Sequence, residues 1–153
     1  MASATDQRII GPGGVIGIVG GGQLGRMIAL AARKLGYGVH VLDPEPRCPA
    51  SHVADHHTVA AYGDVAVARR FADGVDVVTF EFENVPAEAL AAIAHDRPVR
   101  PDPSVLHTTR HRAREKAFVR SAGVAVADFH GCHSLDDLRA GIARLGAPAV
   151  LKT

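Results

Sequence analysis

The hydrophobic residues of this chain gather in short runs that are separated by amphipathic segments. Runs that predict buried strands lie at residues 15–19, 39–43, 57–60 and 75–82. Segments with the 3.6-residue spacing of helices lie at residues 27–32, 64–72 and 87–94. Asp64 and Pro86 stand where an N-cap and a helix start are expected. The alternation of strands and helices predicts an α/β fold with a mainly parallel, doubly wound sheet.

The pattern changes where Pro-Asp-Pro occupies residues 101–103. The elements expected beyond it are helices at 112–121 and 134–145, a short apolar segment at 124–129 and a strand at 147–152. Ser134 is the expected N-cap of the last helix, with Asp137 at its third position. These elements predict the opening of a second domain.

Three segments therefore divide the chain. We expect a flexible N-terminal arm over residues 1–14, an α/β domain over 15–101, and the beginning of a second domain over 102–153. A final strand without a partner would leave an open sheet edge, which natural domains usually avoid. We therefore expect the chain to be the N-terminal portion of a longer protein.

Composition excludes several classes of partner. The 153 residues are 47% hydrophobic and 22% charged, as in globular proteins, and the net charge of +1 gives no electrostatic reason to expect nucleic acid or an acidic membrane. The chain contains neither the apolar core of a signal peptide nor an apolar stretch long enough for a membrane helix. Its two cysteines have no paired spacing, which favours a reducing, cytoplasmic location.

A glycine-rich turn joins the first strand to the first helix. Gly20, Gly22 and Gly25 match the pattern G-x-G-x-x-G, which permits a tight turn, close approach of a ligand and close packing of helix and strand. The N–H groups at such a helix N-terminus favour a phosphate or carboxylate. The pattern occurs in dinucleotide sites and also in mononucleotide or sugar-phosphate sites, so it predicts a phosphorylated small molecule without naming it.

Carboxylates end two of the predicted strands. Asp43 lies 18 residues after Gly25, where a dinucleotide enzyme places its ribose-binding carboxylate, although Asp-Pro also simply terminates strands. Glu81 and Glu83 fall on one face of the strand at 75–82. Ligands of open α/β sheets bind at the carboxyl ends of strands. Either glutamate could accept a hydrogen bond from a ribose hydroxyl or an amine, or simply be solvated.

Basic residues gather in the second half of the chain. Arg112 and Lys116 share a helix face and could converge on a phosphate, or form a solvated face. Lys152 ends an apolar run and either reaches water or meets an anion. His107 and His111 have helical spacing but no third ligand, so we assign no metal site. No Ser/His/Asp or Cys/His arrangement is recognisable, so we assign no catalytic residue.

Together these segments resemble a known family. The residues that carry the resemblance are 20–27, 43–44, 79–85, 112–116 and 150–152. In this order they resemble the N-terminal part of ATP-grasp ligases, and most closely that of the 5-(carboxyamino)imidazole ribonucleotide synthases of purine biosynthesis. The resemblance implies a Rossmann-like pre-ATP-grasp domain that does not bind NAD, followed by the start of an ATP-grasp domain.

The resemblance also assigns roles to individual residues. Gln23, Leu24 and Glu81 match positions that contact the substrate, aminoimidazole ribonucleotide. Arg112 and Lys152 match positions that bind ATP. No residue of this chain is implied to be catalytic or to bind a metal.

The implied reaction joins bicarbonate to the exocyclic amine of the ribonucleotide while ATP becomes ADP and phosphate. The ligands of the Mg²⁺ that this reaction uses are expected beyond the end of this chain, so we expect the chain to be inactive by itself and the full-length enzyme to be a homodimer. Asp43 then becomes mainly a strand terminator. Two alternatives remain: an NAD(P)-dependent oxidoreductase, which the glycine pattern and Asp43 favour, and a non-catalytic nucleotide-binding module.

Overall fold

The structure is a computed structural model that describes residues 9–152, and the chain divides into two compact units after Leu106. The strands of the first unit are β1 (Val15–Val19), β2 (Gly38–Asp43), β3 (His56–Val59) and β4 (Val77–Phe80). Its helices are α1 (Gln23–Lys34), the 3₁₀ helix η1 (Pro49–His52), α2 (Val65–Asp73) and α3 (Ala87–Asp96), and α4 (Pro103–Thr109) spans the division.

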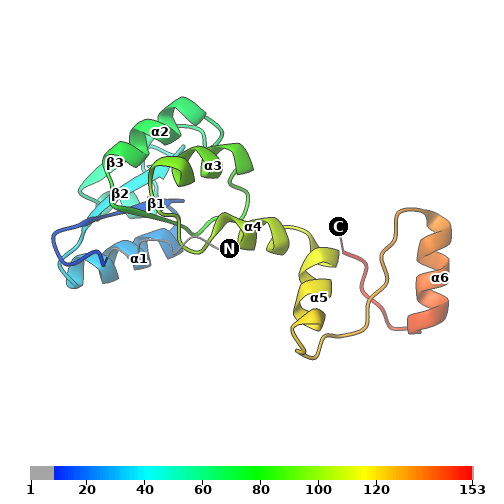
Figure 1. Ribbon diagram of the computed structural model, residues 1–153. Coiled ribbons are helices and arrows are strands. Elements are labelled where there is room, and N and C mark those ends of the chain that lie inside the picture. Colours follow the sequence, from blue (N-terminus) through cyan, green and yellow to red (C-terminus); the bar gives the residue numbers. More distant parts are fainter. Residues whose placement is uncertain (1–8, 153) are drawn as a thin grey trace. The chain divides into compact units, whose positions relative to one another are not determined.

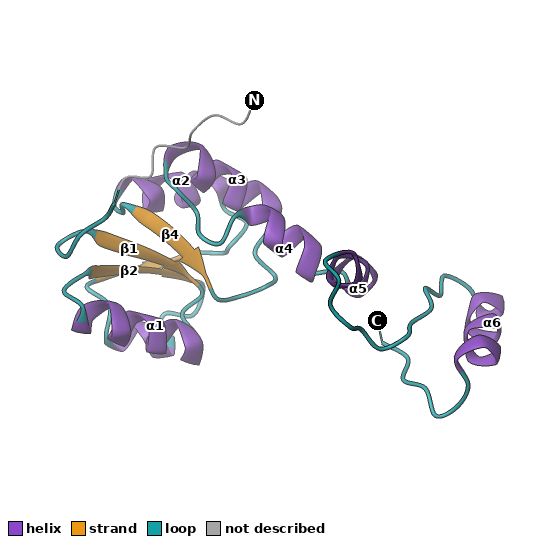
Figure 2. Cartoon of the chain, turned by 60° about the horizontal axis from the view of Figure 1, so that its bottom comes forward, coloured by secondary structure: helices purple, strands orange, loops and turns teal. Residues whose placement is uncertain are grey.

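The four strands form one parallel sheet in the order β3-β2-β1-β4. Ile18 in β1 pairs with Val41 of β2 on one side and Thr79 of β4 on the other. Helix α1 covers one face of the sheet, while α2 and α3 cover the opposite face (Figures 1 and 2). The prediction of an α/β fold with a parallel, doubly wound sheet is therefore confirmed.

Hydrophobic side chains fill both faces of the sheet. Phe71, Leu90 and Ile93 lie buried between the sheet and helices α2 and α3. On the other face Ala29 and Ala32 of α1 pack on the sheet, and their small side chains let the helix approach it closely. All strands run in the same direction, so their carboxyl ends meet at one edge.

Local signals account for several helix boundaries. Asp64 caps α2 as predicted, because its Oδ1 accepts a hydrogen bond from the Val67 N–H at 3.0 Å. Helix α6 (Leu135–Leu145) begins in the same way, where Ser134 Oγ accepts from the Asp137 N–H at 3.1 Å. The Asp64 carboxylate and the Ser134 hydroxyl thus each satisfy an N–H group that has no acceptor inside its helix.

We expect Asp64→Ala to lower the free energy of unfolding by about 1 kcal/mol, since it removes the acceptor at the start of α2. Urea denaturation of the chain measures this change. Asp73→Ala, at the exposed last residue of the same helix, is the control and should not reduce stability, because a carboxylate there opposes the helix dipole. Equal losses in the two variants would contradict the capping role.

The second unit contains α5 (Arg112–Ser121) and α6, and it differs from the prediction at its end. The predicted strand at 147–152 is wrong, because these residues form no strand. Val150 and Leu151 are 80% and 66% exposed. A strand is stable only when its backbone pairs with a neighbour, and within residues 107–152 no strand forms that could be that neighbour. The apolar segment at 124–129 is likewise irregular.

Two smaller differences concern individual elements. Strand β4 is shorter than the predicted 75–82, because the Val75 N–H still bonds the carbonyl of Ala72 in the preceding turn. Helix α4 was not expected after the Pro-Asp-Pro segment.

The N-terminal arm lies outside the described residues over 1–8, and near its end the carbonyl of Ile10 accepts a hydrogen bond from the Tyr37 hydroxyl at 2.9 Å. Between residues 9 and 152 no helix has the length and hydrophobicity that crossing a bilayer requires.

Candidate functional site

The candidate site lies where β1, β2 and β4 reach the carboxyl edge of the sheet. After Val19 the chain turns at Gly20, whose φ of +107° is a conformation that side chains rarely adopt. The Gly20 N–H donates to the carbonyl of Leu42 at 3.0 Å, so the turn is tied to the end of β2. The turn leads directly into α1, as the glycine pattern predicts.

Glu81 fills the space above this turn. Its Oε1 accepts a hydrogen bond from the Gly22 N–H at 3.3 Å. A Cβ atom on Gly20 would lie 2.8 Å from the same oxygen and one on Gly22 would lie 3.0 Å from it, so the carboxylate would have to shift if either position carried a side chain. The Glu81 N–H donates a hydrogen bond to the carbonyl of Val19 at 3.1 Å, which holds the Glu81 backbone at the sheet edge. The anion-binding turn thus already contains an anion that belongs to the protein.

This arrangement decides which chemistry the turn can serve. A second anion, such as a pyrophosphate, would meet the Glu81 carboxylate at the place where a dinucleotide site binds it. The half-buried carboxylate instead presents acceptor lone pairs, which suit an amine or a hydroxyl. The geometry therefore favours a hydrogen-bond donor at this point and disfavours a dinucleotide.

Asp43 is also occupied by protein groups. It is 7% exposed, and its carboxylate accepts hydrogen bonds from the Gly21 N–H at 2.6 Å, the Glu45 N–H at 2.8 Å and the Tyr62 hydroxyl at 2.6 Å. A ribose-binding carboxylate must be open to the ligand. The oxidoreductase alternative therefore loses the residue that favoured it, and Asp43 does more than end a strand.

Gln23 and Leu24 are the first two residues of α1 and are both exposed, Leu24 to 59%. No side chain caps this helix at Gly22, and the first N–H groups of a helix have no acceptor within it. Gln23 and Leu24 directly follow Gly22, whose N–H bonds Glu81. The structure therefore brings all three predicted substrate-binding residues to one end of α1.

The other predicted residues belong to other segments of the chain. Glu83 is exposed beyond the end of β4 and is not on a common strand face with Glu81. Arg112 is exposed, and its guanidinium bonds the carboxylate of Glu115 at 2.9 Å. Lys152 is exposed in the irregular end segment, so the expectation that it ends a buried strand is wrong.

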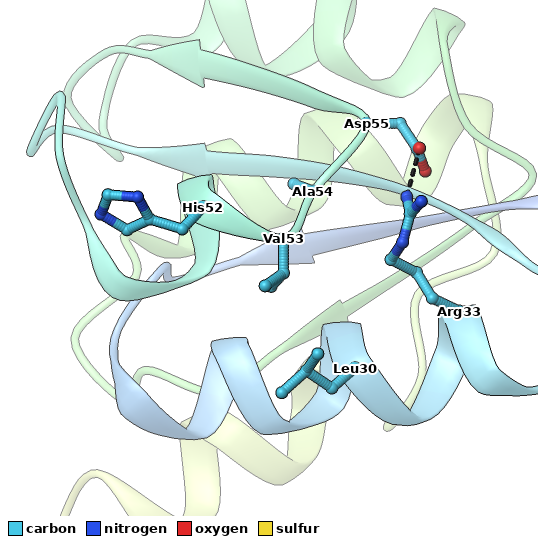
Figure 3. Close-up of a pocket in the computed structure, with 6 residues that line it drawn as sticks. All are labelled: Leu30, Arg33, His52, Val53, Ala54 and Asp55. Atoms are coloured by element: carbon cyan, nitrogen blue, oxygen red, sulfur yellow. Dashed lines mark hydrogen bonds and ion pairs between the residues drawn. The ribbon is translucent and has the colours of Figure 1, made fainter.

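A hollow of about 340 Å³ lies beside α1, lined by Leu30, Arg33, His52, Val53, Ala54 and Asp55. Leu30 and Val53 face each other across it, and Arg33 forms an ion pair with Asp55 (Figure 3). Asp55 also accepts a hydrogen bond from the N–H of Val39, at the start of β2. The charged side chains that line the hollow, Arg33 and Asp55, are thus paired with each other, and we do not assign a ligand site to the hollow.

Sequence reasoning missed two residues of the site. Tyr62 reaches Asp43 from the loop after β3, and burial, followed by the hydrogen bond to Asp43, raises the pKa of its phenol. Cys48 is buried against Gly21, where a Cβ atom would overlap its sulfur. None of these contacts follows from local spacing. The Gly-Gly-Gly run was the one visible signal, since it has more glycines than the pattern needs.

Comparison with known proteins gives a consistent result. The model of the ribonucleotide synthetase pre-ATP-grasp domain matches residues 14–110. The N5-carboxyaminoimidazole ribonucleotide synthase of Pseudomonas aeruginosa is 46% identical over 138 residues, which are 90% of this chain and 38% of that protein. The chain spans about two fifths of the length of several curated relatives that it matches.

Solved structures agree. The ADP complex of an N5-carboxyaminoimidazole ribonucleotide synthetase aligns with a TM-score of 0.88 and 41% identity, covering 93% of this chain and 38% of the other. The Aspergillus clavatus enzyme, solved with ADP and 5-aminoimidazole ribonucleotide, aligns with a TM-score of 0.80 and 29% identity, covering 89% and 37%.

Proposed function

This chain belongs to the family of ribonucleotide synthetase pre-ATP-grasp domains, and we propose that it is the ribonucleotide-binding N-terminal part of an N5-carboxyaminoimidazole ribonucleotide synthase. The observation that carries this proposal is the Glu81 carboxylate inside the glycine turn. It makes the turn a receptor for a hydrogen-bond donor. Aminoimidazole ribonucleotide offers such donors in its exocyclic amine and ribose hydroxyls.

Each predicted binding residue has a separate part in this proposal. Glu81 accepts a hydrogen bond from the amine or a ribose hydroxyl and thereby orients the ribonucleotide. Gln23 and Leu24 contact it from the start of α1, where uncapped N–H groups are available. In the second unit, which we propose begins the ATP-grasp domain, Arg112 and Lys152 contribute to binding ATP, and both are exposed cations.

The proposed reaction of the whole protein is the ATP-dependent carboxylation of the amine. ATP phosphorylates bicarbonate to carboxyphosphate, and the amine nitrogen attacks its carbonyl carbon. The new C–N bond forms as the C–O bond to phosphate breaks, and the nitrogen loses a proton. The protein's contribution is positioning and charge stabilisation, since phosphoryl transfer needs placed cations.

We also propose that the whole protein is a cytoplasmic homodimer that uses Mg²⁺. The part of the chain that the structure describes has no group of three or more His, Cys, Asp or Glu side chains arranged to hold a metal ion. We therefore assign no residue of this chain to Mg²⁺ and derive no step through it.

Calorimetric titration of the chain tests the proposal. We expect aminoimidazole ribonucleotide to bind in a one-to-one ratio and NADH to show no binding. The Glu81 carboxylate occupies the place where the turn would bind the pyrophosphate, and the Asp43 carboxylate is bonded to protein groups and is not open to a ribose. Ribose 5-phosphate, which lacks the base and its amine, is the matched control ligand and should bind more weakly. Binding of NADH together with indifference to the ribonucleotide would reject the proposal.

A further inference from the structure

A buried carboxylate joins the end of β2 to the glycine turn. Asp43 Oδ2 accepts from two donors at 2.6 Å, the Gly21 N–H and the Tyr62 hydroxyl, and Oδ1 accepts from the Glu45 N–H. The Gly21 carbonyl is held as well, because it accepts from the Ala50 N–H at 2.9 Å. Both polar groups of Gly21 are therefore fixed from outside the turn.

Tyr62 connects this carboxylate to the segment that carries Glu81. Its hydroxyl bonds Asp43, and its ring packs on that of Phe82 with 5.3 Å between the centroids. Phe82 directly follows Glu81 in the chain. The side chain of Tyr62 thus spans the distance from the end of β2 to the end of β4.

The placement of Glu81 depends on this connection. Its partner in the turn, the Gly22 N–H, lies in one planar peptide unit with the Gly21 carbonyl that Ala50 holds. If the Gly21 peptide rotated, the Gly22 N–H would turn away from Glu81. The φ and ψ angles of Gly21 join this plane to the preceding peptide unit, whose N–H Asp43 holds, so fixing both units fixes the direction of the Gly22 N–H.

We propose that Asp43 and Tyr62 are positioning residues of the ligand site, which fix the Gly21 peptide and thereby the relative placement of the Gly22 N–H and the Glu81 carboxylate. The identity of the ligand rests on the proposed function, whereas the positioning itself can be measured without any ligand.

The ionisation of Tyr62 supports this arrangement. Burial, the hydrogen bond to Asp43 and the negative charges of Asp43 and Glu81 all raise the pKa of the phenol above its ordinary value of 10.0. The phenol therefore remains a donor throughout the neutral range. Its contribution to stability is complete below pH 10 and is lost as the pH rises through the higher pKa of the folded state.

The chain offers a matched pair of variants, because it contains two tyrosines and each donates from its hydroxyl. In Tyr62→Phe we expect amide hydrogen exchange at Gly21 and Gly22 to accelerate about fivefold, the effect of losing one ordinary hydrogen bond. Amides in the middle of β1 and β2 should keep their rates. Tyr37→Phe removes the bond to Ile10, away from the turn, and should leave both glycines unchanged.

Asp43→Asn is the second variant and keeps the shape of the side chain. It should accelerate exchange at Gly22 as well as at Gly21, although of these two glycines only Gly21 bonds Asp43 directly. Acceleration spread evenly over the sheet, or confined to Gly21, would overturn the proposal, since Asp43 would then have only a structural role.

Titration with ribonucleotide separates this proposal from the proposed function. Where the wild type binds, Tyr62→Phe should raise the dissociation constant about fivefold and Tyr37→Phe should not change it. A wild-type chain that binds no ribonucleotide would reject the proposed function, while the exchange rates at Gly22 would still decide the positioning role.

Ultraviolet titration gives an independent readout of the Asp43–Tyr62 bond. In Tyr37→Phe the single remaining tyrosine is Tyr62, so the tyrosinate absorbance reports its pKa alone. We expect ionisation above pH 10, and a lower pKa when Asp43→Asn is added, because the charge that opposes ionisation is removed. An unchanged pKa would contradict the bond.

Discussion

Replacement of Glu81 by glutamine is expected to weaken binding of aminoimidazole ribonucleotide between about 10-fold and 100-fold, the range for losing a hydrogen bond to a charged group. The side chain keeps its size, so the turn keeps its shape. It loses the negative charge and one acceptor, and its amide nitrogen would face either the Gly22 N–H or the donor of the ligand. Calorimetric titration of the wild type and the variant measures the difference.

The same substitution should have an opposite effect on simple anions. The wild-type turn holds the Glu81 carboxylate against N–H groups that otherwise attract phosphate. Removing that charge removes a repulsion between close like charges, and inorganic phosphate should bind the variant about tenfold more tightly than the wild type. A general loss of structure would weaken both ligands, so the opposite signs distinguish a changed site from a damaged one.

Glu83→Gln is the matched control. It makes the same chemical change two residues further on, at an exposed side chain beyond the end of β4. We expect it to leave the dissociation constants of both ligands within about twofold, as for a surface charge away from the site. Equal effects of the two substitutions would contradict the role of Glu81, because a long-range charge effect would then explain them.

The position of Glu81 could be predicted because it depends on few facts. A parallel sheet brings the carboxyl ends of its strands to one edge, so a residue just after β4 must lie near the turn that follows β1. The pattern of apolar runs was sufficient to predict the sheet. That the carboxylate enters the turn, and so changes its preference from anions to donors, required the distances between Glu81 and the glycines.

The partners of Asp43 could not be predicted in this way. Tyr62 lies 19 residues further along, in a loop between β3 and α2, where its ring packs on Phe82 and its hydroxyl bonds Asp43. Loop side chains follow no period that a sequence pattern could detect. The interpretation of Asp43 as a strand terminator was therefore incomplete rather than misplaced: the carboxylate does end β2, and it also holds the turn.

The second unit shows the limit of apolar patterns. Residues 147–152 have the composition of a buried strand, but a strand also needs a neighbour and a covered face. The helix α6 formed as predicted because its signals, the Ser134 cap and its acceptor geometry, are local. Elements whose stability comes from distant residues are the ones that local sequence cannot specify.

Gly25→Ala is expected to lower the free energy of unfolding by roughly 3 kcal/mol, which is a large part of the stability of an ordinary domain. A Cβ atom at this position would overlap the carbonyl oxygen of Gly20. Because that oxygen belongs to the backbone, no side-chain rotation can relieve the overlap. Either α1 moves away from the sheet, or the turn opens and strains the bond from the Gly20 N–H to Leu42.

Helix propensity predicts the opposite sign for the change in the free energy of unfolding, so the measured sign distinguishes the two effects. Alanine favours a helix over glycine by about 1 kcal/mol, so propensity alone predicts that Gly25→Ala stabilises the chain. Ala31→Gly, at an exposed position of the same helix, measures that propensity term and should cost about 1 kcal/mol. Urea denaturation with an unchanged slope gives both values. A stabilised Gly25→Ala would mean that the first turn of α1 can leave the glycine turn freely, and the close approach that places Glu81 above it would not be required by the fold.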